Sequence, residues 1–125
     1  MEQEEYLENA NNRFENIVDE IISESSADDR MQKILEVATD VEPIPDVGRY
    51  YTFVYAPKTP RIEYDQNPLI ACMEVQRWGF RGLNYHWGKF RNYTWNEVLG
   101  QLHVIYPMEL TDLRSIPYQY FRINN

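Results

Sequence analysis

The sequence changes character at Gly48, and this change constrains the fold more than any other feature. Residues 1–47 contain fourteen acidic and three basic residues, a net charge of −11, and only two of the eighteen aromatic residues. Residues 48–125 contain nine basic and six acidic residues, a net charge of +3, and the other sixteen aromatic residues. Because large rings dominate the cores of small proteins, we expect the core in the second part. The sequence predicts an acidic helical arm with a Pro-containing linker over residues 1–47 and an aromatic-rich β domain over residues 48–125.

The acidic arm has helical spacing. Apolar residues recur every three or four positions over residues 7–22 and again over residues 31–38. Ser26, followed by Asp28 and Asp29, is typical of a helix N-cap with carboxylates at the positive end of the helix dipole. The segment Pro43–Asp46 cannot continue a helix. The pattern therefore predicts two short amphipathic helices followed by a linker.

Two short amphipathic helices cannot bury their apolar stripes alone, so the stripes must pack on each other, on the β domain or on a partner. If they pack on a partner, the predicted partner-binding residues of the first helix are Leu7, Phe14, Ile17 and Ile21. The acidic faces are interpreted as solvated surface or as an imitation of a phosphate backbone. The second interpretation would let the arm cover a basic site or contact a host or viral protein.

The β domain has four segments with strand character: residues 50–55, 69–75, 79–87 and 118–123. Thr94 and Glu97 have the spacing of a capping box, and the apolar residues that follow predict a helix through Ile105. A further helical turn is expected at residues 111–115. Together these elements predict an α+β fold, in which the two-helix acidic arm is followed by a small curled antiparallel β-sheet or SH3-like barrel with one packed helix.

Cations and rings interleave between residues 77 and 95, a pattern that suits nucleic acid because cations neutralise phosphates while rings stack on bases. The predicted nucleic-acid-binding residues are Arg77, Trp78, Arg81, Tyr85, Trp87, Lys89 and Arg91. The alternative is that these rings form the core of the β domain and the cations its solvated rim. Alternation along the 79–87 strand puts Arg81 and His86 on opposite faces and leaves open which face meets solvent.

The sequence predicts no catalytic, metal or cofactor site. The two histidines, His86 and His103, and the one cysteine, Cys72, lack the spacing of a zinc site, and no phosphate-binding loop is present. Cys72 lies in an apolar strand, where a thiol is inert. A ribonuclease built on His86 with Arg81 or Glu74 is the enzymatic alternative.

Motifs in the order Gly48, Tyr50–Tyr55, Pro57-Lys58, Tyr64–Leu69 and Gly79–His86 carry a family resemblance. Over Gly48–Trp87 the chain resembles small, mostly unassigned proteins of T4-like and marine tailed bacteriophages, and it departs from them at Trp87-Gly88-Lys89, where a leucine-proline step is expected. The resemblance implies a phage origin, with the host cytoplasm or the virion as the location, and supplies no catalytic residue. The strand, basic loop and proline-led strand are also similar in pattern to the entry of barrel ribonuclease toxins.

These observations predict a non-enzymatic phage interaction protein whose β domain binds nucleic acid or a nucleoprotein. The longest apolar run, Leu69–Met73, is far too short to span a bilayer, so no membrane partner is expected. Two alternatives stay open: a virion structural or assembly protein that docks through its N-terminal helices, and a barrel-type ribonuclease.

Overall fold

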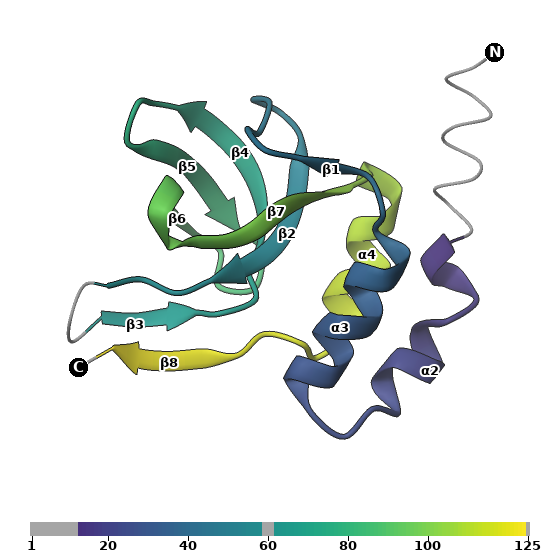
Figure 1. Ribbon diagram of the computed structural model, residues 1–125. Helices are drawn as coiled ribbons and strands as arrows, with labels where there is room; N and C mark the ends of the chain where they lie inside the picture. Colours follow the sequence, from purple (N-terminus) through teal and green to yellow (C-terminus); the bar gives the residue numbers. More distant parts are fainter. Residues whose placement is uncertain (1–12, 59–61, 125) are drawn as a thin grey trace, which may run out of the picture.

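The computed structural model describes residues 13–58 and 62–124 and has an α+β architecture, in which an antiparallel sheet packs against short helices (Figure 1). The helices are α2 (Val18–Ile22), α3 (Ala27–Val37) and α4 (Leu110–Ser115), with 3-10 turns at Trp95–Glu97 and Pro107–Glu109. The strands are β1 (Val41–Glu42), β2 (Tyr50–Tyr55), β3 (Ile62–Asp65), β4 (Leu69–Val75), β5 (Gly79–Asn84), β6 (Lys89–Thr94), β7 (Val98–Ile105) and β8 (Phe121–Asn124). The expected α+β class is confirmed. Within these residues no helix is long and apolar enough to cross a membrane.

Six strands form one sheet in the order β1-β7-β2-β4-β5-β6, and β3 pairs with β8 in a second sheet. Every pairing is antiparallel, and register shifts interrupt the β2–β7 and β4–β5 pairs. Such bulges bend a strand and increase its twist. Among the described residues no pairing joins β1 to β6, so these are the edge strands. The antiparallel sheet is as expected, and an SH3-like barrel stays a prediction.

The two faces of the sheet contact different cores. In β2, Tyr51, Phe53 and Tyr55 point into an aromatic core shared with β4, β5, β6 and β7. The alternate residues of β2 point toward the helices, where Leu69 and Ile105 pack with residues of α2, α3 and α4. In Figure 1, α3 and α4 stand beside one end of the sheet, and α2 lies outside α3. The alternation of β2 thus separates an aromatic core from a helical one.

The acidic arm packs on the β domain of its own chain. Phe14 and Ile21 are fully buried in the helix-side core, and Ile17 is partly buried against it. Burying one such side chain is worth about 1.5–3 kcal/mol. Strand β1, within residues 1–47, pairs with β7. The expected domain boundary between residues 47 and 48 stays a prediction. Residues on its two sides contact each other in the helix-side core and in the β1–β7 pair.

The predicted N-cap of the second arm helix, α3, is confirmed. Its N-cap is Ser26, whose hydroxyl accepts a hydrogen bond from the backbone N–H of Asp29 at 3.1 Å, with Asp28 and Asp29 in the first turn. The first expected helix is interrupted by a turn at residues 16–17, between the helical residues 13–15 and α2. The part of it before residue 13 lies outside the described residues.

The prediction of a helix over residues 95–105 is wrong. Only Trp95–Glu97 forms a 3-10 turn, and the rest is β7, hydrogen-bonded between β1 and β2. Gly100 in the middle has φ +81°, and the β-branched Val98, Val104 and Ile105 favour a pleated strand. Thr94 gives no cap to the backbone, since its hydroxyl bonds the Glu97 carboxylate instead. The packed helix is α4, at the expected helical turn of residues 111–115.

Two strand bounds also differ from expectation. The strand predicted over residues 79–87 ends at Asn84, because a turn closed by a hydrogen bond from the N–H of Gly88 to the carbonyl of Asn84 (2.8 Å) follows it. The closing strand begins at Phe121 rather than residue 118, since Tyr118 is fully buried in the helix-side core.

Candidate nucleic-acid interface

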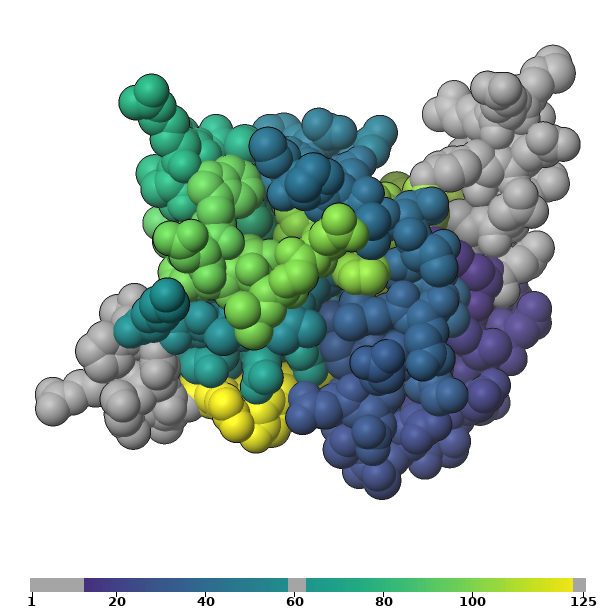
Figure 2. All heavy atoms as spheres, in the orientation of Figure 1, coloured from purple at the N-terminus to yellow at the C-terminus, as the bar shows by residue number. Residues whose placement is uncertain are grey.

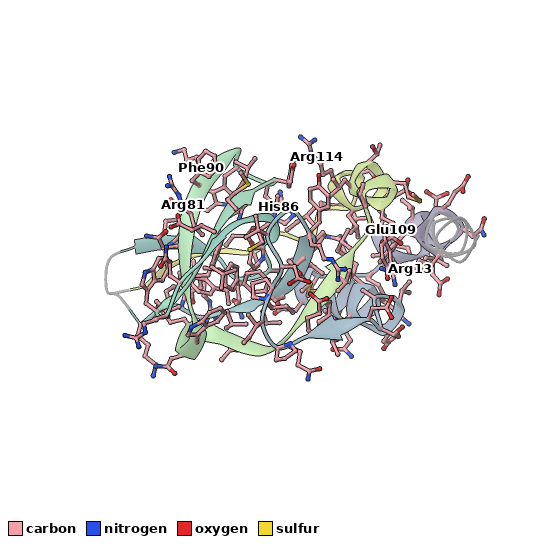
Figure 3. All side chains as sticks on the ribbon, turned by 90° about the horizontal axis from the view of Figure 1, so that it is seen from above. Arg13, Arg81, His86, Phe90, Glu109 and Arg114 are labelled. Carbon is pink, nitrogen blue, oxygen red and sulfur yellow. The ribbon has the colours of Figure 1, made fainter. Side chains whose placement is uncertain are left out.

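Four of the seven predicted nucleic-acid-binding residues meet at the β5–β6 hairpin. We define the hairpin surface as Arg81, Trp87, Lys89, Phe90 and Arg91. Phe90 lies opposite Leu83 in the pairing register and is 53% exposed, and the Arg81 guanidinium sits over its ring at 4.8 Å from the centroid. Figure 3 shows Arg81 and Phe90 together, at the end of the molecule opposite Arg13 and Glu109. The β5–β6 hairpin thus presents the Phe90 ring and the Arg81 cation to solvent.

A hollow of about 240 Å³ adjoins Phe90. Its lining residues are Asn84, Trp87, Lys89, Phe90 and Arg91. The Arg91 guanidinium lies 5.9 Å from the Trp87 ring centroid and donates to the carbonyl of Glu63 at 2.8 Å. The Trp87 ring also packs edge-on against Phe121 of β8, with centroids 4.6 Å apart. The hollow is smaller than the 300–1,000 Å³ or so of sites for drug-sized ligands, and its size suits one base or one phosphate.

The cations of the hairpin surface have no carboxylate partner among the described residues. Ion pairs within 4 Å in that part of the chain use Arg13, Lys33, Arg49 and His86. The nearest acid in the pairing register is Glu74, opposite Arg81, and its carboxylate accepts a hydrogen bond from Gln76. Arg81 and Lys89 are therefore available to an external anion, and the charge of Arg91, which donates to the Glu63 carbonyl, is not neutralised by a carboxylate.

The turn that carries Trp87 is held by a buried polar network. The side-chain oxygen of Asn84 accepts from the backbone N–H groups of His86 (2.8 Å) and Trp87 (3.2 Å). Its amide nitrogen donates to Asp65 at 3.3 Å, and the same carboxylate oxygen lies 2.5 Å from His86 Nδ1. These side chains hold the turn against β3, as expected for a polar cluster shielded from water.

The His86 side chain is only 4% exposed and that of Asp65 only 1%. The other ring nitrogen of His86, Nε2, is buried without a hydrogen-bond partner among the described residues, and the ring packs edge-on against Tyr118. A general base must reach the proton it removes, and here the Nε2 atom faces the protein interior. The geometry gives His86 a structural role, and the ribonuclease alternative stays an untested prediction.

Asp65 was not foreseen as the partner of His86. The two residues are twenty-one positions apart: Asp65 ends β3, and His86 lies in the turn between β5 and β6. Asp65 accepts one local hydrogen bond, from the backbone N–H of Asn67 at 3.0 Å, and one distant bond, from the backbone N–H of Tyr120 at 3.4 Å. A turn pattern around Asp65 shows only the local bond.

The other predicted nucleic-acid residues lie elsewhere. Arg77 and Trp78 lie at the β4–β5 turn, where with Lys58 and Trp95 they line a broad hollow of about 660 Å³. Trp78 is 44% exposed. Tyr85 packs against Tyr50 on the helix side of the sheet, with the guanidinium of Arg114 5.6 Å from its ring centroid. The seven predicted nucleic-acid-binding residues thus lie in three separate places: the hairpin surface, the β4–β5 turn and the helix side of the sheet.

The predicted partner-binding stripe is not free in this structure. Phe14 and Ile21 are buried, Ile17 is half-buried, and Leu7 lies outside the described residues. The described part of the arm does not cover the hairpin surface either. Figure 2 shows the helical residues of the arm gathered at one end of the molecule, away from β5 and β6. The helical part of the arm and the hairpin surface therefore lie at opposite ends of the molecule.

No cluster of three or more His, Cys, Asp or Glu residues suited to a metal ion occurs within residues 13–58 and 62–124. Cys72 is buried, and burial raises the pKa of its thiol, so the reactive thiolate is disfavoured.

No known protein family, curated protein or solved structure matches the chain. The resemblance to phage proteins stays a prediction.

Proposed function

We propose that this protein is a non-enzymatic nucleic-acid-binding protein that uses its β5–β6 hairpin surface. The observation that carries the proposal is the exposed Phe90 ring under the Arg81 guanidinium, with Lys89 and Arg91, which have no carboxylate partner among the described residues, on either side of Phe90 along β6. Cations placed around an exposed ring are the arrangement that binds phosphates and stacks on bases. Phe90 is the most exposed aromatic side chain among the described residues, and an exposed ring beside cations is a surface suited to a ligand.

The distribution of charge supports a local site rather than a general attraction. The whole chain has a net charge of −8, so its overall field repels a polyanion. The helices of the described arm lie at the far end of the molecule, and the three cations of the hairpin surface have no carboxylate within 4 Å among the described residues. Binding would therefore depend on these three residues and be strongly weakened by salt.

The expected salt dependence follows from the number of cations. Three phosphate contacts give a slope of log K against log salt of about −2 for single strands and about −3 for duplexes. Affinity would then fall roughly 20- to 40-fold between 50 and 200 mM salt. A variant with one remaining contact would lose only about threefold over that range.

The test is fluorescence anisotropy of the full chain with labelled oligonucleotides at both salt concentrations. The variant R81Q/K89Q should bind more weakly than wild type and have the shallower salt slope. The matched control K33Q/R49Q changes net charge equally but removes cations that pair with acidic residues in the arm. It should bind as wild type does. The proposal fails if wild type does not bind at 50 mM salt, or if both double variants weaken binding equally.

A further inference from the structure

Resting on the proposed function, we infer that the ligand of the hairpin surface is single-stranded nucleic acid, with one unpaired base on the Phe90–Arg81 platform and the adjacent nucleotide at the Trp87 hollow. The platform is the first part of the argument. Phe90 lies on the outer face of the edge strand β6, away from the aromatic core. Its ring and the planar guanidinium over it both offer flat faces to a base.

A base can use such a platform only when its own face is free. In a duplex each base face is covered by its neighbours in the stack, so a protein reaches only base edges and phosphates. The hairpin is also badly shaped for a groove. Strand β5 is paired with β4 as well as β6, and the sheet is six strands wide, or about 24 Å at 4.8 Å per strand. A major groove is only about 12 Å wide.

The number of cations also favours unpaired nucleic acid. Three cations supply few phosphate contacts, and a duplex held by them alone would have to overcome the repulsion of a chain with net charge −8. Stacking adds affinity without further charge. Each stacked base is worth about 5- to 150-fold in Kd.

The hollow gives the platform its second subsite. Phe90 forms one of its walls, so it begins where the platform ends. Trp87 and Arg91 add a second ring and guanidinium, and Lys89 adds a mobile cation at the rim. The ring of Trp87 is braced by Phe121 from β8, which holds it in place before a ligand arrives. Two successive nucleotides therefore match the platform and the hollow.

The test compares one single-stranded and one duplex probe on folded full-length variants. The probes are labelled ten-nucleotide oligothymidine and a ten-base-pair DNA duplex, in 50 mM salt, with oligouridine as the RNA probe. Wild type should bind the single strands at least tenfold more tightly than the duplex. F90L keeps apolar bulk but removes the ring, so its affinity for single strands should fall 5- to 150-fold, with little change in its affinity for the duplex. N92A, on the same face of β6, is the matched control and should bind as wild type does.

The outcomes separate the two proposals. If the DNA duplex binds as tightly as the single strands, or if F90L binds the single strands as tightly as wild type does, this inference is wrong. In that case the proposed function still stands when R81Q/K89Q weakens binding. If no probe binds wild type, the proposed function itself fails, and with it this inference. Quenching of tryptophan fluorescence on binding gives a second readout, and thermal melts show whether each variant is folded.

Discussion

The bond between Arg13 and Glu109 gives the sharpest stability prediction, because it connects the acidic arm to the β domain at a buried site. Glu109 is 1% exposed and accepts from Arg13 Nε at 2.5 Å, from Arg13 Nη2 at 2.9 Å and from the backbone N–H of Tyr106 at 2.9 Å. Arg13 also donates to the carbonyl of Val104 at 2.9 Å. Replacing Glu109 with Leu removes the acceptor of three hydrogen bonds and leaves a guanidinium, 17% exposed, with Asp40 at 3.8 Å as its nearest remaining carboxylate.

The magnitude follows from this geometry. Removing one partner of a buried pair costs about 3–5 kcal/mol, because the other charge is left unpaired. At about 2.1 cal/mol/K per residue, the unfolding entropy of 125 residues is about 0.26 kcal/mol/K. E109L should therefore lower Tm by about 11–19 °C. E109Q keeps one acceptor oxygen, so we expect a smaller loss.

The assay is urea unfolding followed by far-UV circular dichroism, as a double-mutant cycle with R13M and R13M/E109L. The double variant has no unpaired charge, so its cost should be well below the sum of the two single costs. Burial raises the pKa of Glu109 and Arg13 opposes this, so R13M should raise that pKa further. The folded state of R13M would then hold the proton more tightly than the unfolded state, and its penalty should shrink from pH 7 toward pH 5. Additive single costs, or an E109L cost below about 1 kcal/mol, would refute the reasoning.

Two further predictions concern the aromatic core and the hairpin. Burial raises the pKa of Tyr55 to about 12, and also raises the pKa values of Tyr51, Tyr93 and Tyr118. Stability should be complete below pH 10 and be lost as pH rises above it, so the last rise in absorbance at 295 nm should coincide with loss of the far-UV signal. Full phenolate absorbance near pH 10 with an intact far-UV signal would contradict this. A Cβ on Gly79 would lie 1.9 Å from the carbonyl oxygen of Tyr93, so G79A should separate β5 from β6 and abolish nucleic-acid binding, whereas G88A, at φ +71° with open space around it, should lose only about 1 kcal/mol in urea unfolding and keep binding.

Where the information was local, sequence reasoning worked. The Ser26 cap of α3 depends on bonds within three residues, and β2 was expected from its own run of aromatic and β-branched residues. The error at Thr94–Glu97 shows the limit of the same reasoning. The spacing of a capping box is also the spacing at which a Thr hydroxyl reaches a Glu carboxylate. Hydrogen bonding to the two neighbouring strands, β1 and β2, favoured strand β7 over the expected helix.

The candidate site was only partly predictable. The interleaved cations and rings identified Arg81, Trp87, Lys89 and Arg91 as candidates, but could not show that Tyr85 packs under Arg114 or that Phe90 is exposed. Period-two alternation tells which residues share a face, and says nothing about which face the helices cover.

The sequence by itself determined the local elements and the division of charge, because caps, turns and alternation act over a few residues and charge is a property of composition. Only the tertiary structure decided where the stripe of Phe14 and Ile21 is buried, that Asp65 meets His86, and which strand lies at the edge of the sheet. Those outcomes depend on packing between segments far apart in the chain, where the free energy of burial selects among faces that are locally equivalent.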